Sequence, residues 1–279
     1  MIQSAPAASA AIDVSDDAAT IYRDGIVGRP GAFEREWVER LREDMMTAFW
    51  KAIQRPNGTV GRGRRRWYVE VHPEQISGFV DLVSHPWVSA VSREVLGADY
   101  KVVEIGFDVP FQGARFQPWH RDFAAPRETV EDRRLTSLAF NLTGVDVTTD
   151  MGPFEIAPGT HWDDATAWEY QMFPPKDSYG HYDELGVRKF PRMGDVSART
   201  ALTIHRGTAH ESPIARPVLI LGVVAGSAAN PDEHDLRLSR DFEASLPPEI
   251  LDRLLYRAVD ELEPITQRHD IELLMMGDA

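Results

Sequence analysis

Three neighbouring residues, His120, Arg121 and Asp122, have side chains that could do chemistry together. They lie in the stretch ARFQPWHRDF, whose aromatic and apolar residues indicate a short β-strand. On a strand, residues two positions apart point to the same face, so His120 and Asp122 would aim at one point while Arg121 faces away. A second histidine from a distant strand would complete a face of two histidines and one carboxylate. That ligand set is typical of non-haem Fe(II) enzymes, because it leaves positions open for a co-substrate and O₂.

A His-Arg-Asp triplet also occurs in the catalytic loop of protein kinases. In that loop an asparagine follows the aspartate after five positions, but position 127 of this chain is arginine. The sequence also lacks an Asp-Phe-Gly triplet, and its segment GRGRRR at 61–66 is not a glycine-rich loop followed by a strand lysine. The sequence therefore excludes a kinase and favours the metal site.

Two histidines, His205 and His210, are candidates for the third metal ligand. Both follow the apolar run ALTI, so their residue type alone does not separate them. The chain contains no cysteine, which excludes disulfides and thiolate ligands and leaves His, Asp, Glu and water to hold a metal. A further histidine, His161, follows the turn sequence Pro-Gly-Thr and is predicted to brace that turn.

The elements that must position these residues are short strands in the middle of the chain. Segments rich in β-branched and aromatic residues and bounded by Gly, Pro or Asp lie at 100–112, 114–123, 135–145, 152–162, 201–208 and 216–226. Helical patterns lie outside them, at 30–53, 85–97 and 246–262. This order predicts an antiparallel sandwich or barrel with helical flanks, and not a sheet of βαβ units. The polar stretch at 170–187 is predicted to be a lid or binding loop.

Several motifs follow the His-x-Asp pair in a fixed order. They are DMGPFEIAPGTHW at 150–162, the Gly-Asp turn at 194–195, and Arg216. Over residues 120–226 this ordered set resembles the phytanoyl-CoA dioxygenase family of Fe(II)/2-oxoglutarate-dependent oxygenases. Members carry an Asn-Gly-Pro-like turn, Pro-Gly-Ser/Thr-His, a Gly-Asp turn, the distal metal histidine and an arginine. The chain departs from this pattern at Met151, where the family usually has asparagine.

The resemblance implies a mainly β fold: a double-stranded β-helix (jelly roll, cupin-like) core with flanking α-helices. We expect one oxygenase domain at 19–279, with the core at 100–228. Residues 1–18 lack Lys and Arg before their apolar part and soon turn acidic. That pattern fits a disordered tail better than a signal peptide.

The family spacing selects His205 as the third ligand. In the family the distal histidine follows the Asp of the Gly-Asp turn by about ten residues and precedes the arginine by about eleven. His205 lies ten residues after Asp195 and eleven before Arg216, whereas His210 lies fifteen after and six before. The resemblance also implies that Arg216 binds the distal carboxylate of 2-oxoglutarate. Gln117 and Asn141 align with further co-substrate contacts.

The activity that the resemblance implies is oxidation of an unactivated C–H bond of a small molecule by Fe(II), 2-oxoglutarate and O₂. Family members act on acyl-CoA thioesters, free amino acids and natural-product scaffolds. Asp122 argues against a halogenase, in which the carboxylate is replaced, while hydroxylation, desaturation and rearrangement stay open. An alternative is a cupin-like metal-binding isomerase or small-molecule-binding protein without oxygenase activity, and a third is an interaction module with incidental histidines.

An arginine-rich segment suggests how the substrate is held. Arg64, Arg66 and Tyr68 would share one face of an extended segment, and two guanidiniums beside an aromatic ring can hold an anion next to an apolar body. We therefore expect a substrate with an acidic group. The alternative is a solvated loop whose charges offset nearby acids.

The charge balance disfavours nucleic acid and anionic membranes as partners. The formal net charge is −14, so the chain repels nucleic acid and anionic membranes. No apolar run approaches the roughly 20 residues needed to span a bilayer. A cytoplasmic location is the default expectation.

Overall fold

Two antiparallel β-sheets form the centre of the molecule, and the computed structural model describes residues 12–166, 168, 171–230 and 234–267. The larger sheet has the strand order β1 (Ile26–Arg29), β8 (Val196–Arg199), β5 (Ser137–Thr143), β10 (Val218–Val224), β4 (Lys101–Pro110), β3 (Arg66–Glu70) and β2 (Val60–Gly61). The smaller sheet has the order β7 (Val187–Lys189), β6 (Phe154–Ile156) and β9 (His205–Gly207). A short parallel pair consists of β11 (Arg237–Ser239) and β12 (Arg257–Val259).

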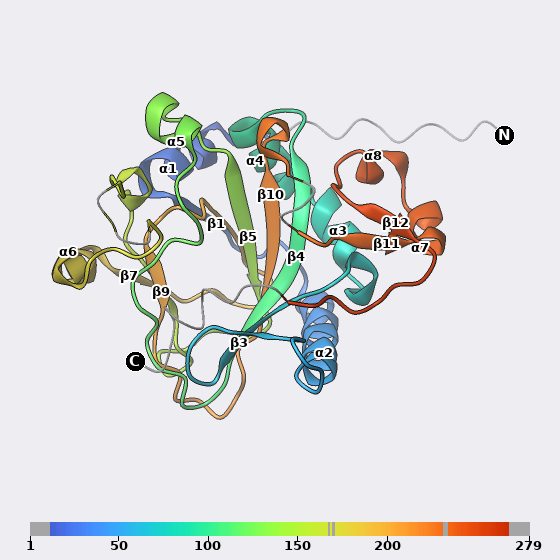
Figure 1. The fold of residues 1–279 in the computed structure, drawn as a ribbon, viewed down its shortest axis with the longest axis horizontal. Helices are drawn as coiled ribbons and strands as arrows, with labels where there is room; N and C mark the ends of the chain where they lie inside the picture. Colours follow the sequence, from blue (N-terminus) through green and yellow to red (C-terminus); the bar gives the residue numbers. More distant parts are fainter. Residues whose placement is uncertain (1–11, 167, 169–170, 231–233, 268–279) are drawn as a thin grey trace.

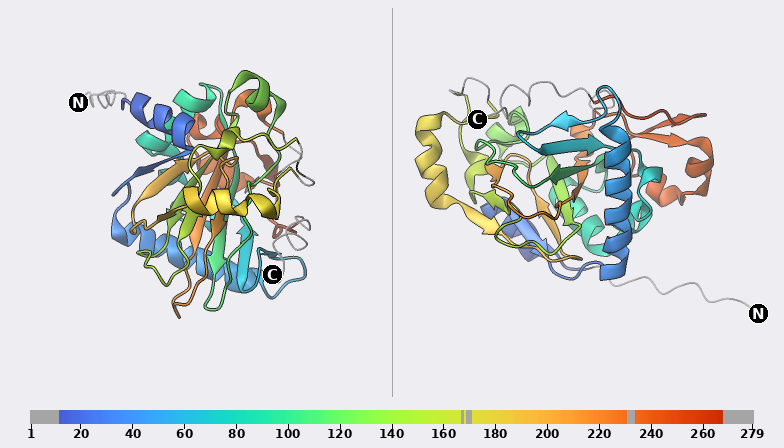
Figure 2. Two further views of the ribbon diagram at one scale, coloured as in Figure 1. Left: turned by 90° about the vertical axis from the view of Figure 1, so that its left-hand side faces the viewer. Right: turned by 90° about the horizontal axis from the view of Figure 1, so that it is seen from below.

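Helices surround these sheets. The α-helices are α1 (Ser15–Asp24), α2 (Arg35–Ala52), α3 (Phe79–Ser84), α4 (Pro86–Leu96), α5 (Arg127–Asp132), α6 (Tyr179–Leu185), α7 (Arg240–Ser245) and α8 (Pro248–Leu251). Short 3-10 helices are η1 (Pro73–Gln75), η2 (Thr160–Trp162), η3 (Lys176–Ser178) and η4 (Gly226–Ala228). Figures 1 and 2 show α2 and α6 on opposite sides of the sheets. Among the described residues, no helix has the length and apolar character to cross a bilayer.

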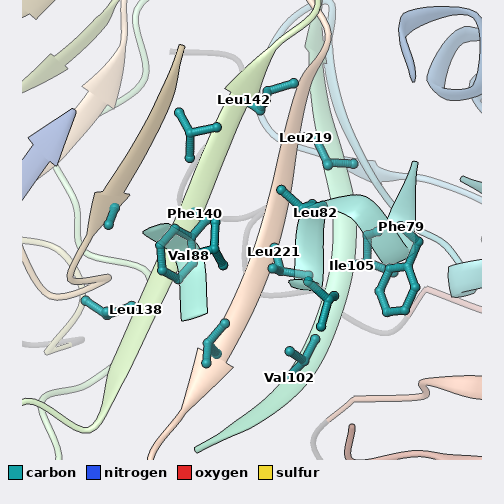
Figure 3. Close-up of a cluster of buried hydrophobic side chains, with 14 of the residues drawn as sticks. Phe79, Leu82, Val88, Val102, Ile105, Leu138, Phe140, Leu142, Leu219 and Leu221 are labelled. Atoms are coloured by element: carbon teal, nitrogen blue, oxygen red, sulfur yellow. The ribbon is translucent and has the colours of Figure 1, made fainter. Parts of the chain in front are cut away.

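The two faces of the larger sheet have different roles because side chains alternate along each strand. One face carries large apolar residues: Ile105 and Leu221 lie beside Phe79 and Leu82 of α3, and Phe140 lies beside Val88 of α4 (Figure 3). The other face carries the polar side chains and lines a cavity between the sheets. The fold is therefore the jelly roll with flanking helices that the sequence predicted.

Two of the three predicted helices are confirmed and one is wrong. The helices expected at 30–53 and 85–97 are α2 and α4, with slightly narrower ends. The helix expected at 246–262 stops after α8, because the following chain pairs with the start of β4. Val102 donates to the carbonyl of Arg253 and accepts from the amide of Leu255, and Leu254 is buried. These tertiary contacts override the local helical pattern, so the helix in the structure has only four residues.

The ends of other predicted elements also shift. Helix α1 begins at Ser15 and buries Ala18, so the disordered tail expected for 1–18 is wrong from Ser15 onward, and residues 1–11 lie outside the described residues. The loop expected at 170–187 contains α6, whose Tyr182 packs on Trp119 with ring centroids 6.1 Å apart. The sequence patterns did not predict seven strands, which are β1, β2, β3, β7, β8, β11 and β12.

His161 joins η2 to α1, as its position after the turn predicted. Its Nε2 donates to the carbonyl of Tyr22 at 3.1 Å, and its Nδ1 would lie 2.9 Å from a Cβ at Gly25. Gly25 ends α1 with φ +82°, a conformation that glycine adopts without strain. Burial lowers the pKa of His161 to about 4, although the bond to Tyr22 opposes this shift.

We expect the free energy of unfolding to fall as the pH drops from 6.5 toward 4 because of His161. The unfolded chain takes up this proton near pH 6.5, while the folded protein resists it until about pH 4. The contribution, about 3 kcal/mol, is therefore present above pH 6.5 and is lost on acidification. Denaturant titrations at pH 7 and pH 4 would show a smaller loss in His161→Gln than in the wild type. Equal losses in the two proteins would show that His161 does not carry this dependence.

Candidate active site

His120, Asp122 and His205 come together in the cavity between the sheets. Each offers a ligand atom, and these atoms lie within 4.8 Å of one another. The main chain aligns them, because the amides and carbonyls of His120 and His205 bond reciprocally at 3.0 and 2.8 Å. The amide of Asp122 donates to Ala201 at 2.9 Å. Residues 114–123 form isolated bridges and not the regular strand expected, yet this pairing still sends His120 and Asp122 to the same side.

Arg121 points away from the site, as predicted. Its guanidinium lies 4.7 Å from the centre of the Trp168 ring, and its Nη2 donates to the carbonyl of Asp163. His205 begins β9, whereas the sequence reading placed it at the end of a strand ALTI. Residues 201–203 form a turn, which feeds β9 toward His120.

The two imidazoles are oriented for metal binding by bonds to backbone carbonyls. His120 Nδ1 donates to Pro118 and His205 Nδ1 donates to Thr203, each at 2.8 Å. A carbonyl only accepts, so each Nδ1 carries the proton and each Nε2 presents its lone pair. Burial, together with the proximity of His205, holds the pKa of His120 well below 6.5, so this ring is neutral at physiological pH.

The size of the site suits a first-row metal ion. His205 Nε2 lies 3.4 Å from Asp122 Oδ1. Bonds of about 2.1 Å place neighbouring ligands of an octahedral ion roughly 3 Å apart, so a small inward movement would close the site around an ion. Three ligands on one face leave the opposite positions open, as an Fe(II) oxygenase needs.

Asp122 is held by a residue that the sequence reading missed, Arg199 of β8. Arg199 Nη1 lies 2.8 Å from Asp122 Oδ2, and its Nε donates to Asn141 Oδ1 at 3.2 Å. Burial opposes ionisation of Asp122, but Arg199 and the two histidines outweigh it and hold the pKa of Asp122 well below its usual value. A signal was available, since Ser197 and Arg199 alternate with Val196 and Ala198 just after the Gly-Asp turn.

We expect Arg199→Gln to destabilise the protein more without metal than with it. In the metal-free protein Arg199 is the main counter-charge of Asp122, and breaking this pair should lower the free energy of unfolding by about 1–3 kcal/mol. A bound divalent ion supplies the missing positive charge, so the loss should shrink. Denaturant titrations with chelator and with excess Co(II) measure both values. The same loss in both conditions would contradict this role.

The competing histidine, His210, is engaged elsewhere. It is fully buried, and its Nδ1 and Nε2 lie 2.6 Å from the carbonyl of Met151 and 2.9 Å from that of Ile214. Neither nitrogen faces the ligand cluster. The structure thus brings together the three residues expected from the spacing and leaves His210 outside.

Arg216 lies in the same cavity, 5% exposed, just before β10. Its Nε donates to the carbonyl of Met151 at 2.9 Å, and its Nη atoms make no hydrogen bond within the described ranges. Burial and the nearby Arg66 lower the pKa of Arg216 to about 10, while Asp108 opposes this shift. Arg216 therefore stays charged at neutral pH and offers a two-pronged donor to a carboxylate.

The cavity that contains these groups has a volume of about 940 Å³. Its walls come from the polar face of the larger sheet, from β6 and β9, and from loop residues such as Phe123 and Met172. A space of this size accommodates a co-substrate and a small-molecule substrate together.

Residues 21–218 match a sequence model of the family described as phytanoyl-CoA dioxygenase (PhyH). The chain belongs to this family. No curated protein matches the chain.

Three solved structures are among those that resemble the fold of this chain. One is the non-heme alpha ketoglutarate dependent carbocyclase SnoK from nogalamycin biosynthesis, with 19% identity, a TM-score of 0.60, and coverage of 75% of this chain and 83% of that chain. Another is EctD from S. alaskensis with 2-oxoglutarate and 5-hydroxyectoine, with 20% identity, a TM-score of 0.62, and coverage of 81% of this chain and 80% of that chain. The third is the epimerase SnoN in complex with Fe³⁺, alpha ketoglutarate and nogalamycin RO, with 21% identity, a TM-score of 0.57, and coverage of 74% of this chain and 81% of that chain. At these identities the likeness establishes the fold.

The cofactors expected for a phytanoyl-CoA dioxygenase family member agree with these neighbours and with the site. Iron and 2-oxoglutarate are present in the SnoN structure, and His120, Asp122 and His205 form the corresponding possible iron site here. The neighbours also include a carbocyclase and an epimerase, so the fold does not determine the reaction.

The two further residues carried over from the family, Gln117 and Asn141, both line the cavity. Gln117 braces β9, because its Oε1 accepts from the amide of Gly207 at 2.8 Å and its Nε2 donates to the carbonyl of Arg62 at 3.0 Å. Asn141 accepts from Arg199 and thus belongs to the support of Asp122. Their contacts with 2-oxoglutarate stay predictions.

The arginine clamp expected from Arg64, Arg66 and Tyr68 does not form. Gly63 and Arg65 have φ of +101° and +55°, so the chain turns there and the expected shared face is lost. Arg64 is exposed and does not line the cavity. Arg66 is buried and lines the cavity, but it bonds to Asp108 and to the carbonyl of Thr208, each at 3.1 Å. Tyr68 lines the cavity, with Arg62 in place of Arg64 at its ring, 4.9 Å from the centre.

Proposed function

We propose that this protein is an Fe(II)- and 2-oxoglutarate-dependent dioxygenase that oxidises an unactivated C–H bond of a small molecule. The observation that carries the proposal is the presence of the His120–Asp122–His205 cluster and the buried Arg216 in one cavity. An isomerase or a simple binding protein with a cupin-like fold would need the cluster but not a buried arginine beside it. The family membership supports the same conclusion.

Each residue has a defined task in this proposal. The Nε2 atoms of His120 and His205 and Oδ1 of Asp122 would hold the metal, and Arg199 would keep Oδ2 of Asp122 occupied. Arg216 would bind the distal carboxylate of 2-oxoglutarate, whose oxidative decarboxylation at the iron supplies the oxidising power. The cavity walls would orient the substrate and exclude water from the reacting groups.

The outcome of the oxidation depends on how the substrate lies in the cavity. The neighbours include a carbocyclase, an epimerase and a protein crystallised with 5-hydroxyectoine, so one fold serves several outcomes. We propose hydroxylation as the primary reaction, with Asp122 occupying the position that a halogenase leaves to a halide. Ring closure or epimerisation is the second candidate, favoured by SnoK and SnoN.

The test is succinate formation by the purified protein with Fe(II), 2-oxoglutarate and O₂. We expect succinate to form slowly alone, faster with a metabolite extract, and not at all after chelation of the metal. Mass spectrometry of the extract then separates the reactions, because hydroxylation adds one oxygen atom, ring closure removes two hydrogen atoms and epimerisation leaves the mass unchanged. A metal-loaded protein that forms no succinate under any of these conditions would refute the proposed function.

A further inference from the structure

Four residues form a row across the cavity wall, from β8 beside the metal cluster to β4, which is three strands away in the same sheet. Strand register pairs Arg199 with Ala139, Ala139 with Gly222, and Gly222 with Glu104. Directly paired residues point to the same face of a sheet, and all four line the cavity. Neighbouring strands are about 4.8 Å apart, so the backbones of Arg199 and Glu104 are separated by roughly 14 Å.

The two residues in the middle of this row have no side chain longer than a methyl group, so they leave open space in the cavity. Gly222 has none, and Ala139 contributes a methyl group. A Cβ at Gly222 would lie 2.8 Å from Glu104 Oε2, so this glycine lets the Glu104 carboxylate lean across β10 into the cavity. Gly106 plays a similar part for Tyr68, whose hydroxyl would lie 2.3 Å from a Cβ at that position.

Glu104 presents a carboxylate that is only partly satisfied. The Tyr68 hydroxyl donates to Glu104 Oε1, and no cation forms an ion pair with Glu104 in the part of the chain that the structure describes. Burial and Glu104 itself raise the pKa of Tyr68 well above 10, so Tyr68 remains a neutral donor. Glu104 is half-buried in the cavity wall, and a carboxylate accepts about four hydrogen bonds, so Glu104 keeps acceptor capacity beyond the bond from Tyr68. A ligand that brings positive charge and N–H donors would use that capacity.

We propose that Glu104 is the specificity residue of the substrate site and binds a cationic nitrogen of the substrate, such as a protonated amine. The inference rests on the proposed oxygenase function, because the reacting carbon would then lie over Ala139 and Gly222, toward Asp122. It replaces the anionic substrate expected from the arginine-rich segment, since the clamp behind that expectation does not form. An anionic group at the Glu104 end would meet like charge, which disfavours it.

Two probes that share an apolar body test the sign of the charge directly. Isothermal titration of cyclohexylmethylamine and of cyclohexylacetate into the full-length protein, loaded with Co(II) and 2-oxoglutarate, measures binding without turnover. We expect the wild type to bind the amine and to bind the carboxylate at least tenfold more weakly. The proposal would be overturned by the wild type alone if the amine did not bind, or if the carboxylate bound as tightly as the amine or more tightly.

Three variants then assign the preference to Glu104. Glu104→Gln keeps the shape and should weaken amine binding by roughly tenfold or more, as expected for a lost hydrogen bond to a charged group. Glu104→Lys should reverse the preference toward cyclohexylacetate. Glu94→Gln, on the exposed surface of α4, is the matched control and should keep the wild-type values. An amine dissociation constant in Glu104→Gln within twofold of the wild type would also overturn the proposal.

A separate measurement distinguishes this failure from failure of the proposed function. Anaerobic addition of Fe(II) and 2-oxoglutarate to the wild type should produce the visible charge-transfer absorption of their complex. If the complex forms but the amine preference is absent, the Glu104 assignment alone is wrong. If the preference is present and depends on Glu104 but no complex forms, the binding site stands and the oxygenase function fails.

Discussion

Replacing His205 with alanine should abolish succinate formation and lower the affinity for Fe(II) by more than about 100-fold. Loss of a residue that merely supports a metal ligand typically costs 10- to 100-fold in affinity, and loss of a ligand should cost more. His120→Ala and Asp122→Ala should behave in the same way, because each removes one of the three atoms that surround the site. Anaerobic titration with Fe(II), followed by a succinate assay, measures both effects.

The matched control for this prediction is His210→Ala. His210 sits five residues further along the chain and is buried, with its ring nitrogens beside the carbonyls of Met151 and Ile214. Its loss should destabilise the turn that carries Arg216 but leave most of the metal affinity. If His210→Ala lost the metal and His205→Ala retained it, the assignment of the cluster would be wrong.

The ligand cluster could be predicted from one local rule and from the spacing typical of the phytanoyl-CoA dioxygenase family. Alternation along an extended segment places His120 and Asp122 on one side, and this holds even though the segment is not a regular strand. The choice of His205 over His210 rests on the resemblance, because the intervals from Asp195 and to Arg216 match those of the family only for His205. Alternation concerns residues close in sequence and the family intervals are fixed, so both could be applied before the strand order of this chain was known.

Alternation after the Gly-Asp turn indicates that Arg199 lies on the polar face of a strand, but its contact with Asp122 could not be predicted, because that contact depends on which strands are neighbours. Arg199 reaches Asp122 only because β8 joins the larger sheet beside β5. Likewise, Glu104 and Arg199 share a row only through β10 and β5, which lie between them. Sheet order is set by tertiary packing, and strand patterns alone leave it open.

The arginine-rich segment shows how one local conformation can defeat an alternation argument. Placing Arg64 and Arg66 on one face assumed an extended chain, whereas Gly63 and Arg65 adopt positive φ and make a turn. Arg66 then enters the sheet as part of β3 and pairs with Asp108, while Arg64 stays in solvent. A glycine within a run of arginines was the available signal for that turn.

Arg216→Ala should raise the KM for 2-oxoglutarate by roughly 30-fold to several thousand-fold. Truncating one partner of a buried charge pair typically costs about 2–5 kcal/mol, which corresponds to that range. Arg216 is buried and has a carbonyl, but no carboxylate, as the acceptor from its Nε within the described residues. Its charge therefore has no direct salt-bridge partner until a ligand carboxylate binds. Steady-state measurement of succinate formation against 2-oxoglutarate concentration gives the KM.

Two further variants test whether the effect depends on the two-pronged geometry of Arg216 or only on positive charge, and whether loss of an arginine outside the cavity has any effect. Arg216→Lys keeps the charge but loses the two-pronged donor, so its KM should lie between those of the wild type and Arg216→Ala. Arg64→Ala removes an exposed guanidinium that does not line the cavity, and its KM should equal that of the wild type. An unchanged KM in Arg216→Ala would exclude this arginine from co-substrate binding. A raised KM in Arg64→Ala would instead mean that the segment around the turn closes over the cavity when 2-oxoglutarate binds.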